Sequence, residues 1–248
     1  MTETSETKRA AVHALIDERA DELIELLREL IRFPSVNAAP KENMPFGVEV
    51  QRAFDYMLGR ARADGFETVN VDNYGGHIDW QGAEYDEAGE MIALASETLG
   101  IPVHLDVVPA GNGWSVDPFA AELIGNKMYG RGTTDNKGAV VAVYCAMKAL
   151  RDAGFMPEKN IRLLLGLDEE TGWSGMVKYL EKVPAPDLGF SPDGDFPVIN
   201  GEKGILDFGI AKKLEKTRDK GIIIRSIEGG VASNSVPDKA RAIIMDEA

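Results

Sequence analysis

The feature that most constrains the fold is a continuously apolar run, NIRLLLGL, at residues 160–167. A run of this kind is typical of a strand that is buried on both faces of a sheet. Helical patterns flank it, since KGAVVAVYCAMKALRDAGF precedes it, with Gly154 near its end, and GWSGMVKYLEKV follows it. Strands that alternate with helices in this way predict an α/β domain with a central, largely parallel sheet flanked by helices.

The remaining segments fit the same plan. Apolar positions recur at helical spacing over 12–33, which predicts one amphipathic helix that stops at Pro34, and 49–64 predicts a second helix. The segments FETVNVDN, GHIDWQ, EMIALAS and IPVHLDVV are expected to be strands, with Pro102 tolerated only as a first residue. After about residue 200, GILDFGIAKKLEK and GIIIRSIEGG predict strands without a long helix between them. We therefore expect one domain over 1–200 and the beginning of a smaller α+β domain over 201–248.

Charge and composition exclude several classes of function. The chain has 27 Lys and Arg against 41 Asp and Glu, a net charge of −14, which argues against a broad surface for nucleic acid or for an anionic membrane. The single Cys145 cannot form an internal disulfide, and the sequence has neither a secretory leader nor a long apolar run. We therefore expect a cytoplasmic protein that binds neither nucleic acid nor membrane.

Polar residues follow the expected strands in four places, where ligands bind in open α/β sheets. The first is HLDVVP, in which His104 and Asp106 are two residues apart and so share one face of a strand. An imidazole that binds a metal commonly donates its other N–H to a carboxylate, which would be the role of Asp106. A histidine whose hydrogen bonds are satisfied in the core is the alternative for His104 taken alone.

The other three places carry carboxylates. Asp135 lies in the Gly-rich loop YGRGTTDNKG before a helix, where an N-cap is the alternative role. Glu169 and Glu170 lie in LLLGLDEETGW, where a solvated acidic turn is the alternative, and Asp193 lies in a turn-like segment. Together, one imidazole and several carboxylates at successive strand ends form the nitrogen and oxygen ligand set that suits a zinc-like ion. Trp114 and Trp173 are interpreted as packing residues.

Four motifs occur in the order HLDVVPAGNGW, GRGTTDNKG, GLDEETGW and SPDGDFPVINGEKG. In this order they resemble the di-zinc metallopeptidase family of dipeptidases, carnosinases, aminoacylases and desuccinylases. The patterns DEE-x-GW and PD-x-x-FP-x-x-x-GEKG are similar to those of bacterial dipeptidases of the PepV kind. The resemblance runs over nearly the whole chain, from FPSVN to NSVPDKARA.

The resemblance implies four metal ligands, which are His104, Asp135, Glu170 and Asp193. Asp135 would bridge two ions, Glu169 would be the general base, and Asp106 would hold His104 in position. It also implies two zinc ions per complete enzyme, and manganese or cobalt would also suit a carboxylate-rich site. In the segment NSVPD, Asn234 matches a substrate-binding asparagine of the lid domain.

The expected activity is the hydrolysis of dipeptides by a metal-activated water, with a small peptide as substrate. Deacylation of N-acyl amino acids by the same site is the alternative. The family takes a further histidine from near the end of a longer chain, whereas His13 and His77 here lie in no matching motif. The chain is therefore interpreted as the N-terminal part of such an enzyme, inactive alone, with most of the catalytic domain in 1–200 and the beginning of the lid in 201–248. A non-catalytic metal-binding protein is the remaining alternative, and the sequence does not indicate an oligomeric state.

Overall fold

The computed structural model describes residues 5–195, 198–204, 206, 208–213, 221–230, 236–237 and 239–247. The chain divides into two compact units, Met1–Gly194 and Asp195–Ala248. Among the described residues, no helix combines the length and the apolar character needed to cross a membrane.

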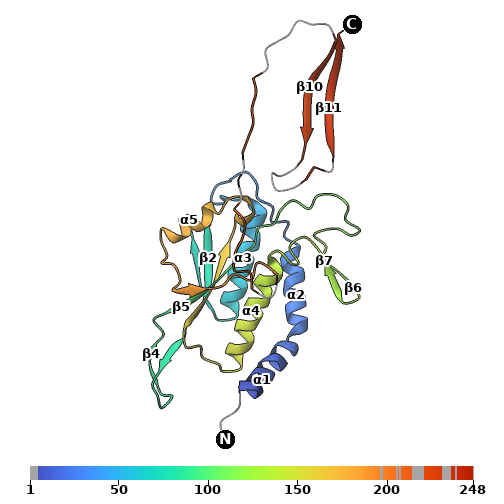
Figure 1. Cartoon of the computed structure of the whole chain (residues 1–248). Coiled ribbons are helices and arrows are strands. Elements are labelled where there is room, and N and C mark those ends of the chain that lie inside the picture. The colour runs from blue at the N-terminus through green and yellow to red at the C-terminus, as the bar shows by residue number, and fades with distance from the viewer. Residues whose placement is uncertain are drawn as a thin grey trace. The chain divides into compact units, whose positions relative to one another are not determined.

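The first unit is built on a five-stranded sheet in the order β1-β2-β8-β5-β9 (Figure 1). Its strands are β1 Glu67–Val71, β2 Gly75–Trp80, β5 Thr98–His104, β8 Asn160–Gly166 and β9 Leu188–Gly189. The β1–β2 and β2–β8 pairs are antiparallel, whereas β8–β5 and β5–β9 are parallel. The α/β fold is confirmed, and the sheet is mixed. The apolar run that predicted a buried strand is β8, which lies at the centre.

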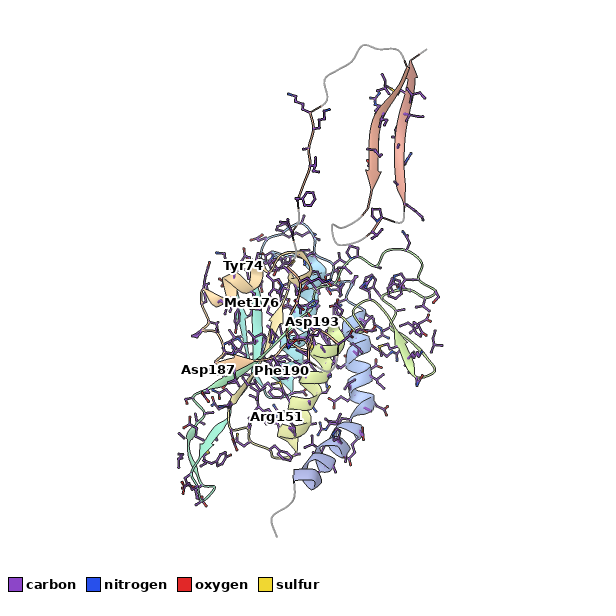
Figure 2. All side chains as sticks on the ribbon, in the orientation of Figure 1. Tyr74, Arg151, Met176, Asp187, Phe190 and Asp193 are labelled. Atoms are coloured by element: carbon purple, nitrogen blue, oxygen red, sulfur yellow. The ribbon has the colours of Figure 1, made fainter. Side chains whose placement is uncertain are left out.

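Helices cover the two faces of this sheet. They are α1 Ser5–Asp17, α2 Ala20–Ile31, α3 Val48–Ala63, α4 Lys137–Asp152 and α5 Ser174–Leu180, with a 3₁₀ turn, η1, at Glu169–Thr171. The main core lies between α2, α3, α4 and one face, to which β8 contributes Leu163 and Leu165. A smaller cluster joins Leu164 of β8 to Tyr179 of α5 on the other face. An apolar groove of about 450 Å³ beside α5 is lined partly by Met176 and Phe190, which Figure 2 labels.

Two small hairpins extend from the first unit: β3 Ala83–Tyr85 pairs with β4 Met91–Leu94, and β6 Glu122–Ile124 pairs with β7 Lys127–Tyr129. The helices expected at 49–64 and after Lys137 are α3 and α4. The single helix expected over 12–33 is instead the pair α1 and α2, and this expectation was wrong. Between Ile16 and Leu23 the sequence offers no large apolar side chain, so no packing requires the helix to continue through residues 18–19.

Pro102 lies inside β5 and not at its first residue, because the strand begins at Thr98. The backbone groups of Gly100 and Pro102 point toward the β9 side, where Phe190 donates its N–H to Gly100 O and the Ser191 hydroxyl donates to Pro102 O. Since β9 ends at Gly189, a proline nitrogen at this position costs the sheet no ladder hydrogen bond. The expectation that Pro102 must begin the strand was therefore wrong.

The second unit contains an antiparallel pair, β10 Gly221–Gly229 and β11 Ala240–Glu247, with an irregularity between Ile224 and Ser226. The segment GIIIRSIEGG thus forms the expected strand. In the segment GILDFGIAKKLEK, the described residues 208–213 are not in a strand. Asn234 lies outside the described residues, so its role in substrate binding stays a prediction, as does the assignment of 201–248 to a lid domain.

Candidate metal centre

The candidate site lies at the carboxyl ends of β5 and β8. These strands are parallel, and their register pairs His104 with Gly166, so the end of β5 and the acidic turn after β8 meet at one edge of the sheet. Asp135 comes from the turn before α4, and Asp193 follows β9. Figure 2 shows Asp193 beside the end of α4 that follows Asp135. Four segments distant in sequence therefore converge on this edge.

His104 is 1% exposed, and its two ring nitrogens have different partners. Nδ1 lies 3.0 Å from the backbone oxygen of Asp106 and 3.4 Å from its carboxylate Oδ1. Nε2 lies 3.0 Å from Oδ1 of Asp135 and 3.4 Å from Oδ2 of Asp193. A proton on Nδ1 that is donated to Asp106 leaves the Nε2 lone pair directed at these carboxylates, which is the tautomer that a metal requires.

Asp106 is fully buried, and its carboxylate is saturated with donors. Oδ1 accepts the backbone N–H of Glu169 at 3.1 Å, and Oδ2 accepts the backbone N–H of Glu170 at 3.1 Å. The Asn37 side-chain amide donates to Oδ2 at 3.1 Å. Asp106 thus connects the end of β5 to the acidic turn as well as contacting His104, so it fixes the positions of three candidate site residues at once.

The three consecutive acids of the turn have different surroundings. Asp168 is buried, and its carboxylate accepts the Ser174 hydroxyl at 2.7 Å and the Gly175 N–H at 3.0 Å. It therefore holds the first turn of α5 and does not face the site. Glu169 points toward the site, with Oε2 4.0 Å from Nε2 of His104, and Glu170 joins the same group of side chains.

Two groups of ligand atoms have a spacing that suits a metal ion. His104, Asp135 and Asp193 form one, and His104, Glu169 and Glu170 form the other, with the ligand atoms of each group within 4.8 Å of one another. Zinc binds imidazole nitrogen and carboxylate oxygen at about 2.0–2.2 Å, so atoms that share an ion lie within about 4.4 Å. Both groups need only small side-chain movements to hold a cation.

The electrostatics of the site also fit a cation. Burial, and then the charge of Asp135, raises the pKa of Glu170 to about 7. Burial likewise raises the pKa of Glu169. Burial alone would lower the pKa of His104, but its contact with Asp106 and the charge of Asp193 raise it to about 9. Besides burial, each shift includes the charge of a neighbouring carboxylate, which a divalent ion would neutralise.

Asn136 is a site residue that the sequence pattern did not reveal. Its side chain is buried, its Oδ1 accepts the backbone N–H of His104 at 3.3 Å, and its Nδ2 donates to Oδ1 of Asp193 at 2.7 Å. The peptide bond between Asp135 and Asn136 is cis. Because Asn136 occupies one oxygen of Asp193, the other oxygen faces His104. Its position directly after Asp135 was the only sequence signal available.

The two remaining histidines lie elsewhere. His77 is buried between β2 and α5, with Nδ1 2.6 Å from the Tyr179 hydroxyl and Nε2 3.4 Å from Oδ2 of Asp79. His13 is exposed on α1. Within the part of the chain that the structure describes, neither joins the two ligand groups, and His104 is the one imidazole in them.

Comparison with known proteins agrees with this geometry. The model of peptidase family M20/M25/M40 matches residues 100–236, a span that contains all the candidate ligands. The chain belongs to this family. The family resemblance of the four motifs is therefore confirmed.

Individual members of family M20 extend the comparison. A Beta-Ala-Xaa dipeptidase from Lactobacillus delbrueckii subsp. lactis is 36% identical over 233 residues, which are 93% of this chain and 47% of that protein. Human carnosine dipeptidase 1 is 27% identical, with a TM-score of 0.55 over 69% of this chain and 37% of that one. The yeast di-peptidase Dug1p, at 20% identity and a TM-score of 0.55, supports the fold alone. The chain spans about half the length of the curated relatives it matches.

Proposed function

We propose that this M20 chain carries the site of a metal-dependent dipeptidase, with Glu169 as the general base. The observation that carries the proposal is the convergence of His104 with four carboxylates at one sheet edge. The names of the relatives support dipeptides as the substrate class. The relatives are about twice as long as this chain, so the activity is proposed for the protein that contains the complete site.

The ligands divide between two ions. His104, Asp135 and Asp193 would hold the first. Glu170, whose pKa the charge of Asp135 raises, would hold the second together with Asp135. Two zinc-like ions would lower the pKa of a bound water and neutralise the charge that develops on the scissile carbonyl oxygen. Zinc suits this nitrogen and oxygen set, and manganese or cobalt would also fit its carboxylates.

Glu169 is the group proposed to move the proton. Its Oε2 faces the ligand cluster, 4.0 Å from Nε2 of His104, while its Oε1 accepts the indole N–H of Trp173 at 3.2 Å. The carboxylate would take a proton from the attacking water and return it to the leaving amine. Burial, the first cause, raises the pKa of Glu169, which makes its carboxylate a stronger base.

The test is Glu169→Gln in the complete protein loaded with zinc. We expect turnover of dipeptides to fall by about 10²–10⁴-fold, because the base is lost. Metal content should not change, since the ligands remain. Glu181→Gln is the matched control, because Glu181 is exposed on the far end of α5 and pairs with Lys178. Turnover within tenfold of the parent would overturn the assignment, and cleavage of N-acyl amino acids in place of dipeptides would overturn the substrate class.

A further inference from the structure

Trp173 has a conformation and an exposure that a packing residue would not need. Its backbone is left-handed, with φ of 60°, a region that residues other than glycine rarely adopt. The residue is 38% exposed, so its ring is only partly covered. The interpretation of Trp173 as a packing residue therefore does not account for what the structure shows.

The backbone around Trp173 is held in this conformation by Asp168. The carbonyl oxygen of Asp168 accepts the N–H of Trp173 at 3.0 Å, and its carboxylate accepts the Ser174 hydroxyl and the Gly175 N–H. Asp168 itself is 3% exposed. Backbone strain of this kind persists only where the surroundings fix it, and it occurs often at functional sites. The turn is therefore built to direct the indole toward a particular place.

The indole reaches Glu169. Its Nε1–H donates to Oε1 of Glu169 at 3.2 Å, whereas Oε2 of the same carboxylate lies 4.0 Å from Nε2 of His104. The two oxygens of Glu169 are thus distinguished, with one occupied by a donor and the other facing the ligand cluster. A terminal carboxylate has a broad torsional preference of its own, so an external donor is needed to fix the orientation of the carboxylate plane.

We propose that Trp173 is a positioning residue, which holds Oε1 of Glu169 through its indole N–H so that Oε2 is presented to the reacting water. The proposal rests on the proposed function of Glu169 as general base. Reacting groups must be held closely in their productive geometry, and a displacement of about 1 Å can cost about 10²-fold in rate. A single hydrogen bond that selects one carboxylate rotamer should therefore affect the catalytic rate and leave substrate binding unchanged.

The contact itself can be tested without any activity. The chain contains three tryptophans, so ¹⁵N-labelled protein gives three indole N–H resonances, which tryptophan-to-phenylalanine variants assign. Glu169→Gln replaces a charged acceptor with a neutral one and should move the Trp173 indole proton upfield, since charge-assisted hydrogen bonds are the stronger ones. The Trp80 and Trp114 resonances should stay in place, and Glu181→Gln should move none. An unchanged Trp173 resonance in Glu169→Gln would overturn the proposal.

The role is tested by Trp173→Phe in the complete, zinc-loaded protein. Phenylalanine keeps an aromatic ring and is as unfavourable as tryptophan in a left-handed backbone conformation, but it has no side-chain N–H donor. We expect kcat to fall by about tenfold with KM within about twofold and metal content unchanged. Trp114→Phe is the matched control, because it also removes an indole donor, here one that binds the backbone oxygen of Ala110 at 2.7 Å, and it should keep kcat.

The outcomes separate this proposal from the proposed function. If Glu169→Gln keeps its turnover, the general-base assignment fails whatever Trp173 does. If Glu169→Gln abolishes turnover while Trp173→Phe keeps kcat within twofold, the general base stands and the role of Trp173 is overturned. A rise of KM in Trp173→Phe at constant kcat would also overturn it, since that would place the indole in substrate binding.

Discussion

The buried Asn136 side chain donates a hydrogen bond to the partly exposed carboxylate of Asp193, which orients that carboxylate. We predict that Asn136→Leu, which is similar in size but has no polar atoms, weakens zinc binding by about 10–100-fold, the usual effect of losing a group that orients a ligand. Titration calorimetry of the metal-free variant measures this directly. An affinity equal to that of the parent would show that Asp193 is oriented without its neighbour.

Asp79 gives the protein a pH-dependent part of its stability. Burial would raise the pKa of Asp79, but hydrogen bonds from His77 and then from Arg162 hold it below its ordinary value. Arg162 contacts both oxygens, at 2.9 and 2.8 Å. Because the folded-state pKa is the lower one, the stabilisation is complete above the unfolded value of about 3.9 and is lost as the pH falls through the folded-state pKa.

Asp79→Asn should therefore lower the free energy of unfolding at pH 7 by about 1–2 kcal/mol, the cost of weakening a partly buried charged hydrogen bond. The difference in the free energy of unfolding between variant and parent should shrink below about pH 4, because the Asp79 carboxylate of the parent begins to be protonated there. Urea denaturation at several pH values checks both statements. A difference that stays constant down to pH 2 would contradict them.

At the residue scale, the sequence predicted the side chains that meet at the site and the contact of Asp106 with His104, but not the other residues that hold them. His104, Asp135, Glu169, Glu170 and Asp193 follow strands or precede a helix, and this position made them candidates. The supporting residues Asn37, Asn136 and Trp173 are ordinary loop residues in the sequence. The partners of Asn37 and Asn136 become apparent only in the folded structure, as when Asn37 contacts Asp106, 69 residues away.

At the scale of elements, Lys137 joins two helices. The first residue of α4 is fully buried, and its Nζ donates to the backbone oxygens of Leu30 at 3.0 Å and Phe33 at 2.7 Å, at the end of α2. Burial lowers its pKa to about 7. The same two oxygens accept the backbone N–H groups of Phe33 and Ser35, so Lys137 adds a second, charged donor to each of them.

Lys137→Met, which keeps the length of the side chain, should remove a charged hydrogen-bond donor from each of the two carbonyl oxygens and lower the free energy of unfolding by about 2–4 kcal/mol. Hydrogen exchange should also become faster in the last turn of α2. Lys178→Met on α5 is the comparison, because an exposed ion pair such as the one with Glu181 contributes less than about 1 kcal/mol. Equal losses in the two variants would contradict the special role of Lys137.

The elements that the sequence predicted well are those with a strong periodic pattern. For α3 and α4 the apolar spacing gives bounds within about one residue of those observed, because one face of each helix is buried in the main core. The break between α1 and α2 was missed because charged residues fit a helix and a turn equally well. The β3–β4 strand pair was seen only in part and the β6–β7 hairpin was missed, since strands of three or four largely exposed residues carry no such pattern.

At the scale of the whole molecule, the described residues supply one imidazole to the candidate metal centre. His104, Asp135 and Asp193 form a complete set of protein ligands for one ion, whereas Glu170 with a shared Asp135 holds a zinc-like ion weakly without a further imidazole. We predict that the 248-residue chain binds one divalent ion tightly and shows negligible dipeptidase activity. Calorimetric titration with zinc beside a dipeptide hydrolysis assay measures both. Two tight sites with ordinary turnover would show that the chain already contains every ligand.

The parallel pairing of β5 with β8 has a kinetic consequence. Its partners lie about 60 residues apart in sequence, whereas β1 and β2 are joined by a short turn. Closing the longer loop costs more chain entropy, and the edge also needs Asp135 and Asp193, so we predict that the metal-binding edge is completed only after the rate-limiting barrier of folding has been crossed. A cation that binds only the completed edge stabilises the native state and does not stabilise the folding transition state. Zinc should therefore slow unfolding in stopped-flow experiments and leave the refolding rate as it is, and faster refolding would show that the edge forms early.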